Sequence, residues 1–217
     1  MDTKETKIDR KSQTDGIGSG LVRLFLMFML ISCIGWCMET AYVFLCFGRL
    51  SDRGFLSMPF CPIYGASILA VYFAVGTPQG GVLQPLFAKA KGLPLPARAA
   101  AYAGLYLLYF LAAALIPTAA EFLTGLFFDK LFGIRLWDYT DRPFNILGYV
   151  CLPMSALWGL LITAAMALLW TPLEKLLARI PQRAAKAVAF TLAALLLIDF
   201  CGNFIYLCAT GTHYYLF

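Results

Sequence analysis

The sequence predicts an all-α protein, a polytopic bundle of about five transmembrane helices. Of its 217 residues, 61% are hydrophobic and 13% are charged, and the mean hydropathy is +0.76. A soluble domain of this length could not bury so much apolar surface, so a bilayer must cover it. Five apolar segments approach the roughly 20 residues with which a helix crosses a membrane. These segments are residues 21–47, 60–75, 97–128, 146–170 and 184–208.

The chain begins with a polar segment. Residues 1–19 carry charges of both signs, which predicts a disordered cytoplasmic tail ahead of a single transmembrane domain over residues 20–217. The apolar stretch after the tail is too long for a signal-peptide core, and no small-residue cleavage site follows it. We therefore expect the first helix to remain as an anchor.

Two connections on the tail's side of the membrane differ in pattern. Residues 76–96 are rich in glycine and proline, which predicts turns rather than a further span. In residues 171–183 the apolar positions from Leu173 to Ile180 follow the i, i+3, i+4, i+7 spacing of one helix face. Two interpretations stay open: an interfacial helix whose basic side chains reach lipid headgroups, or a docking surface for a cytoplasmic partner.

Basic residues are divided unevenly between the two ends of the predicted helices. Twelve of the 17 lie in the amino-terminal segment, near the 76–96 loop, or in residues 171–186. Because Lys and Arg collect on the cytoplasmic side, we expect the amino terminus inside and the carboxy terminus outside. The net charge of +5 therefore indicates contact with lipid headgroups of the bilayer, and no basic patch with interleaved aromatics supports nucleic-acid binding.

Three carboxylates, those of Glu39, Glu121 and Asp199, lie inside apolar segments. Each costs about 3 kcal/mol to place at the membrane centre, so each needs a partner, a proton or water. At 1.5 Å per residue, all three lie roughly 10 to 14 Å from the outer ends of their helices. Separate structural acids have no reason to share a depth, so we expect one outward-facing acidic cavity. The alternative is that each acid is a separate hydrogen-bonded clasp between helices.

The outer connections are expected to complete this cavity. Residues 52–65 carry charge, glycine and proline between two apolar helices, so their backbone cannot face lipid. Arg53 and Arg142 approach from the two outer loops, and a guanidinium would hold a nearby carboxylate ionised. The aromatic residues there are either an interfacial belt or a wall that stacks on cations. The expected solute-binding residues are Glu39, Arg53, Tyr64, Glu121, Trp137, Asp138, Arg142, Asn145, Trp158, Asp199 and Asn203.

A weak internal repeat connects the two halves. Glu39 is followed by an Asp-Arg-Gly-Phe block and then by Cys61, and Glu121 is followed by an Asp-Arg-Pro-Phe block and then by Cys151. Both units run in the same direction through the membrane, as in transporters built from parallel repeats, although chance similarity is an equal explanation. Cys61 and Cys151 open the second and fourth helices, and both a free and a disulfide-bonded state stay open for them.

The remaining residues indicate no cofactor. The seven cysteines form no CxxC pair and lie at no zinc spacing from the single histidine, His213, so no metal site is expected. Most of them are apolar fillers. No nucleophile and base pair is evident, which makes an enzyme the less favoured interpretation.

Several blocks are specific enough to resemble a known family. They are Gly35–Trp36 with Glu39, Arg53–Leu56, Cys61–Gly65, Trp137–Tyr139, Pro143–Asn145 and Trp158–Gly159. Over about Gly35 to Gly159, the chain resembles the bacterial family described as putative ABC-transporter type IV permeases. The resemblance implies a multi-pass protein of the cell (plasma) membrane that serves transport. In the family's pattern an Arg is expected where this chain has Tyr149, so Arg142 or Arg135 would have to neutralise the acids here.

Three functions follow as hypotheses. The first is a permease subunit whose acidic cavity binds a small cationic or zwitterionic solute. Because the chain has no G-x-x-x-x-G-K-[ST] motif, any ATP hydrolysis would belong to a separate ATPase subunit. The second is a membrane enzyme acting on lipid headgroups, with Glu39 or Glu121 as general base. The third is a non-catalytic assembly subunit. Five helices are few for a complete pathway, so a homo-oligomer or a hetero-complex is expected.

Overall fold

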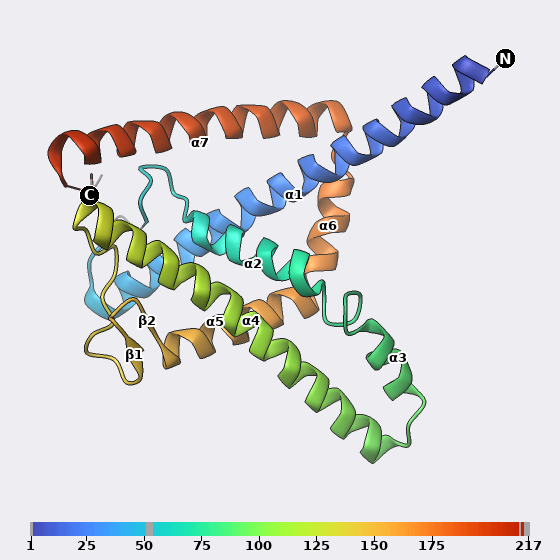
Figure 1. Ribbon diagram of the computed structural model, residues 1–217, viewed down its shortest axis with the longest axis horizontal. Coiled ribbons are helices and arrows are strands. Elements are labelled where there is room, and N and C mark those ends of the chain that lie inside the picture. The colour runs from blue at the N-terminus through green and yellow to red at the C-terminus, as the bar shows by residue number, and fades with distance from the viewer. Residues whose placement is uncertain (1, 51–53, 213, 215–217) are drawn as a thin grey trace.

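The computed structural model describes the backbone of residues 2–50, 54–212 and 214, and the side chains of these residues from 18 onward. The prediction of an all-α bundle is confirmed, with one short antiparallel hairpin added (Figure 1). The elements are α1 (Asp2–Phe47), α2 (Pro62–Val75), α3 (Gln84–Lys91), α4 (Leu95–Phe132), β1 (Asn145–Ile146), β2 (Val150–Cys151), α5 (Leu152–Ala164), the π-helical turn η1 (Ala165–Leu169), α6 (Trp170–Ala178) and α7 (Gln182–Thr210).

Four helical segments are long and apolar enough to cross a membrane. They are Gly18–Phe47 within α1, all of α4, the continuous stretch Leu152–Ala178, and α7. The second predicted span, residues 60–75, corresponds to α2, which is apolar but has only 14 residues. At 1.5 Å per residue it extends about 21 Å, short of the roughly 30 Å hydrocarbon core. The helix α2 is therefore too short to cross the membrane by itself, and residues next to it in the chain would have to span the remaining thickness.

The fourth predicted span is wrong at its amino-terminal end. The sequence analysis placed its start at Ile146, but residues 145–151 form the β1–β2 hairpin, in which Asn145 lies opposite Cys151. The helix α5 begins at Leu152, with Pro153 in its first turn. Proline is favoured there because its missing N–H would have no intrahelical partner in any case.

The same span continues beyond its predicted end. Instead of stopping at Trp170, α5 passes through η1 directly into α6. Pro172 explains the π-helical turn, because its ring excludes the carbonyl of Leu168, four residues earlier, from an ordinary helical hydrogen bond. Residues 171–178 form most of α6, which runs at a steep angle to α5 (Figure 1), and the chain turns at Arg179–Pro181 into α7. The interfacial helix and the docking surface expected here both stay predictions.

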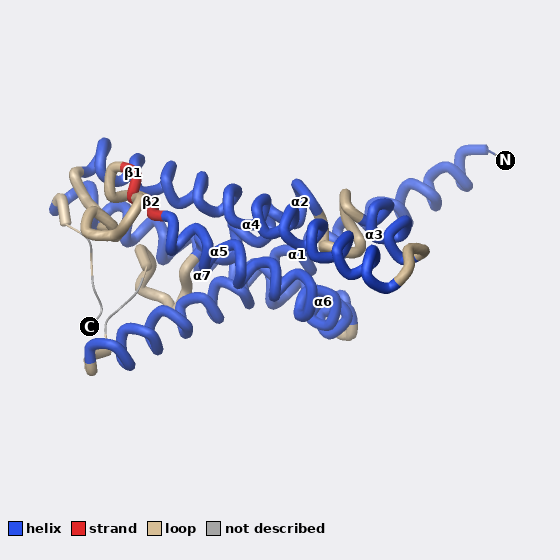
Figure 2. The backbone as a smooth tube through the Cα atoms, turned by 90° about the horizontal axis from the view of Figure 1, so that it is seen from below, coloured by secondary structure: helices blue, strands red, loops and turns tan. Residues whose placement is uncertain are grey.

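The elements divide between two ends of the molecule. The amino terminus, α3 and the corner between α6 and α7 lie at one end, and the hairpin, the α1–α2 connection and the end of α7 lie at the other (Figures 1 and 2). This division matches the two sides from which the basic residues were counted. The assignment of the amino-terminal end to the cytoplasm stays a prediction.

Residues 2–17 continue α1 as helical backbone and project away from the other helices (Figure 1). An isolated polar helix of this length is marginally stable in water. The disordered cytoplasmic tail over residues 1–19 therefore stays a prediction.

The bundle is held together where small residues let helices approach closely. A Cβ atom added to Gly65 of α2 would lie 2.4 Å from Ser32 Oγ of α1, and one added to Gly159 of α5 would lie 2.9 Å from Ala114 Cβ of α4. Close approach of this kind is how membrane helices gain packing energy without a hydrophobic driving force between them. The largest core cluster joins α1, α2, α4 and α5 around the fully buried Tyr109.

The connection between α1 and α2 enters the bundle instead of lying on its surface. Its described part, residues 54–61, is here called the re-entrant segment. Phe55, Leu56 and Phe60 are buried, and the Cys61 N–H donates to the Ser32 carbonyl at 3.1 Å. Ser32 lies 15 residues before the end of α1, or roughly 22 Å along the helix. The re-entrant segment thus lies at membrane depth inside protein, where irregular backbone is tolerated.

Candidate functional site

A cavity of about 50 Å³ lies where α1, α2, α4 and α5 meet the loop that carries the hairpin. We call it the acidic cavity. Both polar and apolar side chains line it, and they come from four helices and one loop. They are Glu39, Tyr64, Glu121, Tyr139, Met154, Leu157, Trp158 and Leu161.

Two of the three predicted acids converge in this cavity. Glu39 comes from α1 and Glu121 from α4, and the two carboxylates are near enough to interact electrostatically. Glu121 is 4% exposed, whereas Glu39 is half-buried. Two like charges in a medium of low dielectric repel each other strongly, so the pair favours a shared proton or a bound cation.

A glycine positions the partner of Glu39. A Cβ atom added to Gly35 would lie 2.3 Å from Cγ of Tyr64, so the tyrosine ring packs directly on α1 at this point. Gly35 and Glu39 are four residues apart and share a helix face. The Tyr64 hydroxyl consequently reaches the next turn and donates to Glu39 Oε1 at 2.8 Å.

Tyr139 is the corresponding partner of Glu121. Its hydroxyl donates to Glu121 Oε1 at 3.1 Å from the loop between α4 and β1. Burial and the neighbouring Glu121 carboxylate raise the pKa of Tyr139 far above its ordinary value. The hydroxyl therefore stays protonated at physiological pH and remains a hydrogen-bond donor.

Two polar atoms in the lining have no hydrogen-bond partner. Oε2 of Glu121 and Nε1 of Trp158 are both buried, and neither has a partner of good hydrogen-bond geometry within the described part of the chain, although the two side chains lie near enough to interact weakly with each other. The Trp158 ring packs against Tyr64, with the ring centroids 4.8 Å apart. A buried carboxylate oxygen without a partner is costly, and the cavity is large enough for one water molecule or one small ion.

Asp199 does not line the acidic cavity, which corrects the expected convergence of three acids. Its Oδ2 accepts the Met58 N–H at 3.2 Å, and its Oδ1 accepts Nδ2 of Asn203 at 3.1 Å. Asn203 also donates to Ser57 Oγ at 3.0 Å. The face of α7 that carries Asp199 is turned toward the re-entrant segment, whose backbone the acid ties to the bundle. This is the clasp that the sequence analysis left as the alternative.

Three more predicted residues build the loop over residues 133–151 instead of lining the cavity. Trp137 Nε1 donates to the Tyr149 carbonyl at 2.7 Å. Asn145 Nδ2 donates to the Thr140 and Arg142 carbonyls, each at 2.9 Å. The Asp138 carboxylate accepts the N–H and the hydroxyl of Thr140. Together these bonds hold the loop in a shape that presents Tyr139 to Glu121.

Charge in the loop is balanced locally. Hydrogen bonds from Thr140, with a smaller contribution from Arg135, hold the pKa of Asp138 below its ordinary range. Arg135 NH1 lies 3.2 Å from Asp138 Oδ2, and its Nε lies 3.7 Å from Asp129 Oδ1. Arg135 is therefore engaged with loop and helix-end acids, and does not take the neutralising role that the sequence analysis considered for it.

Tyr149, where the resemblance led us to expect arginine, makes a contact with α4 like the contact that Tyr64 makes with α1. Its ring lies against Gly125, where an added Cβ would be 3.2 Å from Cδ1, and its hydroxyl donates to Asp129 Oδ2. Gly125 and Asp129 are again four residues apart. The Arg135 guanidinium lies 5.7 Å from the centre of the Tyr149 ring. Tyr149 thus joins the loop to α4.

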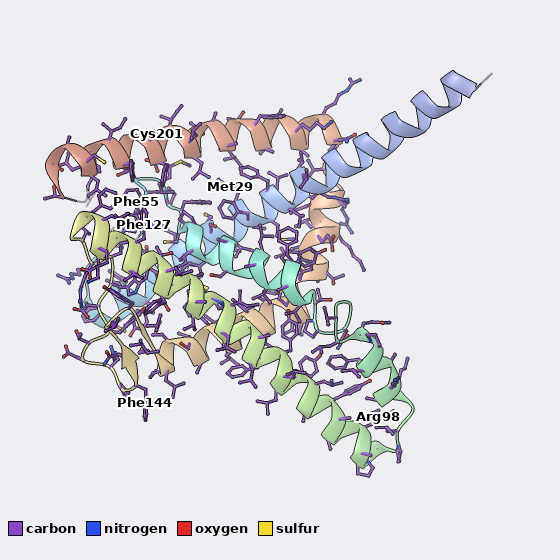
Figure 3. All side chains as sticks on the ribbon, in the orientation of Figure 1. Met29, Phe55, Arg98, Phe127, Phe144 and Cys201 are labelled. Carbon is purple, nitrogen blue, oxygen red and sulfur yellow. The ribbon has the colours of Figure 1, made fainter. Side chains whose placement is uncertain are left out.

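The other predicted residues lie apart from the cavity or outside the description. Arg53 lies outside the described residues. Arg142 is exposed in the loop, and the nearby Phe144 points outward from the hairpin (Figure 3). Cys61 and Cys151, the residues directly before α2 and α5, are both buried, and no disulfide joins them.

Sequence reasoning missed four lining residues: Tyr139, Met154, Leu157 and Leu161. Tyr139 was considered only as one of the outer-loop aromatics, in an interfacial belt or in a wall that stacks on cations, although it directly follows two predicted site residues. The three apolar residues follow a helical spacing with Trp158 on α5, which is the pattern of an ordinary buried face. No local signal separates a cavity wall from helix packing.

The chain also matches a model of a protein family. The family model described as putative ABC-transporter type IV matches residues 26–204, which include both the acidic cavity and the Asp199 cluster. The match confirms the resemblance seen in the sequence and extends it at both ends. No curated protein and no solved structure matches the chain.

Proposed function

The chain belongs to the putative ABC-transporter type IV family, and we propose that it is a permease subunit whose acidic cavity binds the positive charge of a small cationic or zwitterionic solute. The observation that carries this proposal is the pairing of Glu39 with Glu121 at one cavity. Each carboxylate is held by a tyrosine hydroxyl, and Oε2 of Glu121 has no partner of good hydrogen-bond geometry among the described residues.

The chemistry of the lining favours a cation. Two carboxylates supply the acceptors, and the Tyr64 and Tyr139 hydroxyls are already committed to them. An added cation would offset the repulsion between the acids and would occupy the unpaired oxygen of Glu121. The ring of Trp158, packed beside the same cavity, adds a face on which an ammonium group can rest.

The size of the cavity narrows the proposal. About 50 Å³ accommodates a single small ion or an ammonium group, whereas sites for whole metabolites usually reach about 300 Å³ or more. A zwitterionic solute would therefore place only its cationic group between Glu39 and Glu121. The rest of such a solute would require the loop that carries Tyr139 to move aside.

The family membership extends the proposal to a partner. A permease of an ABC transporter works with a separate ATPase, which would bind at the end of the bundle that carries α3 and the α6–α7 corner. This end holds most of the basic residues and is the predicted cytoplasmic side. Affinity purification of the tagged full chain from membranes should recover an ATPase subunit in a stoichiometric amount.

Cation binding can be tested directly on the purified chain in proteoliposomes. Solid-supported membrane electrophysiology would record the charge displaced when alkali cations, ammonium, methylammonium or glycine are added. The wild-type chain should respond to at least one of them, and Glu121→Gln should weaken the apparent affinity at least tenfold. Glu174→Gln is the matched control, because it removes an exposed acid of α6 outside the cavity.

The results separate the three hypotheses. An unchanged response in the Glu121→Gln chain would overturn the proposal, as would the absence of any response in wild type. A chain that recruits its partners normally while lacking all cation response would favour the assembly role. A changed lipid composition in cells that carry Glu121→Gln, with no transport defect, would favour the enzyme.

A further inference from the structure

Two adjoining cavities lie at the other end of the molecule, away from the acidic cavity. The first, here called the corner cavity, has a volume of about 560 Å³ and lies between α1 and the turn that joins α6 to α7. Its polar lining includes Arg23 from α1 and Arg179 from the end of α6. Its remaining lining is mainly apolar, so the cavity has a basic side and an apolar side.

The second cavity is an apolar groove of about 380 Å³ between α1, α6 and α7, here called the α1–α7 groove. It begins where the corner cavity ends, because Leu177, Ile180 and Ala185 line both. From there it follows α1 and α7 as far as the re-entrant segment at Met58–Phe60. No charged side chain lines the groove within the described part of the chain.

We propose that the corner cavity and the α1–α7 groove together bind one phospholipid with an anionic headgroup. The headgroup phosphate would lie between Arg23 and Arg179, and one acyl chain would lie along the groove. The inference concerns residues different from those of the acidic cavity, so it stands or falls independently of the proposed transport function.

The charge of the corner suits a phosphate. A guanidinium group can donate two parallel hydrogen bonds to the oxygens of one phosphate, and it remains protonated at the membrane surface. Arg183 and Lys186 follow in the first turns of α7, which contain no acidic residue. One carboxylate, that of Glu174, lines a neighbouring cavity together with Arg23. Because the basic residues around the corner outnumber this single acid, the corner keeps a net positive charge.

The dimensions of the groove suit one leaflet. Along α1 the two cavities extend from Ser19 to Cys33, which are 14 residues apart, or about 21 Å at 1.5 Å per residue. Half of a hydrocarbon core of about 30 Å is about 15 Å, so an acyl chain that starts at the corner reaches the midplane within the groove. A soluble protein segment could not enter at this depth without losing its backbone hydrogen bonds.

The position of the corner agrees with an anionic lipid. It lies at the end of the bundle that carries the excess of basic residues, the predicted cytoplasmic side. The cytoplasmic leaflet carries the negative surface potential that attracts such residues, by about 1 kcal/mol for each Lys or Arg near the surface. A lipid there would also join α7 to α6 and α1 along a face where α7 has little protein cover.

The test measures which lipid stays bound to the intact chain. The full chain would be reconstituted with equal amounts of phosphatidylglycerol and phosphatidylcholine, transferred to mild detergent, and examined by native mass spectrometry. The wild-type chain should retain one phosphatidylglycerol in preference to phosphatidylcholine. The Arg23→Gln, Arg179→Gln double variant should retain at least tenfold less. Arg98→Gln is the matched control, since Arg98 lies at the start of α4 beside α3 (Figure 3).

A second pair of variants tests the acyl chain. Val188→Trp would fill the groove without touching the arginines, and should lower phosphatidylglycerol retention at least tenfold. Ile198→Trp adds the same bulk at an exposed position of α7 outside the groove and should leave retention unchanged. Inorganic phosphate at millimolar concentration should not displace the lipid, because it makes no contact with the groove.

Several results would overturn the lipid site. They are equal retention of the two lipids by the wild-type chain, undiminished retention in the double arginine variant, and undiminished retention in Val188→Trp. Displacement by inorganic phosphate would show that the corner binds a free anion instead. Recovery of a cytoplasmic protein that requires Arg179, with no retained lipid, would show that the corner is a protein docking surface.

Discussion

Removal of the Asp199 carboxylate should open the re-entrant segment. In Asp199→Ala the Met58 N–H loses its acceptor at 3.2 Å, and Nδ2 of Asn203 loses one of its acceptors. Hydrogen bonds between membrane helices average about 0.6 kcal/mol because the unfolded chain finds other partners. A backbone N–H kept from water without a partner costs more, about 1 to 3 kcal/mol, and we apply this range to the part-buried Met58 N–H because the segment lies at membrane depth.

Cys61 is a natural probe for this opening. It ends the re-entrant segment and is 3% exposed, so a maleimide reaches its thiol only when the segment opens. A cost of 1 to 3 kcal/mol corresponds to a rise of about 5-fold to 150-fold in the open population, and labelling of Cys61 should accelerate by the same factor. Peptide-resolved mass spectrometry would separate its labelling from that of the six other cysteines.

Cys151 provides the internal control. It directly precedes α5 as Cys61 precedes α2, it is 1% exposed, and no described bond joins it to Asp199. Its labelling rate should not change in the variant. An unchanged rate at Cys61 would refute the reasoning. Equal acceleration at both cysteines would also refute it, because the variant would then have loosened the whole bundle.

Two further predictions concern the contact between Gly35 and Tyr64 and the loop over residues 133–151. Gly35→Ala places a Cβ 2.3 Å from Cγ of Tyr64 and should destabilise the bundle by about 1 to 3 kcal/mol, measured by unfolding in mixed micelles. Gly104→Ala, with nothing within 4 Å, should not destabilise it, and equal loss in both variants would contradict the packing argument. The pKa of Asp138 is lowered in the folded loop, so its ionised carboxylate stabilises the loop. This stabilisation should be fully present above about pH 4, the ordinary pKa of an aspartate, and should be lost as the pH falls through the lower pKa of the folded loop. The protection of the Thr140 amide, meaning its exchange rate relative to the intrinsic rate at the same pH, should therefore fall in acid, and a protection independent of carboxylate protonation would contradict this.

The sequence alone was sufficient for the membrane class and most helix positions. A run of about 20 apolar residues has few stable states outside a bilayer, and that property is local. It was insufficient at residues 145–151, because a short apolar hairpin and the start of an apolar helix have the same composition. It was also insufficient at residues 165–169, where a π-helical turn joins α5 to α6 without a break and the apolar spacing gave no sign of it.

The candidate site shows the same division. The depth of Glu39, Glu121 and Asp199 could be counted along each helix, because the helical rise is constant. The direction in which each side chain points depends on the rotation of its helix against its neighbours, which packing sets. Tertiary structure alone therefore decided that Glu39 and Glu121 share a cavity while Asp199 holds the re-entrant segment, since the contacts that orient them join residues far apart in the chain.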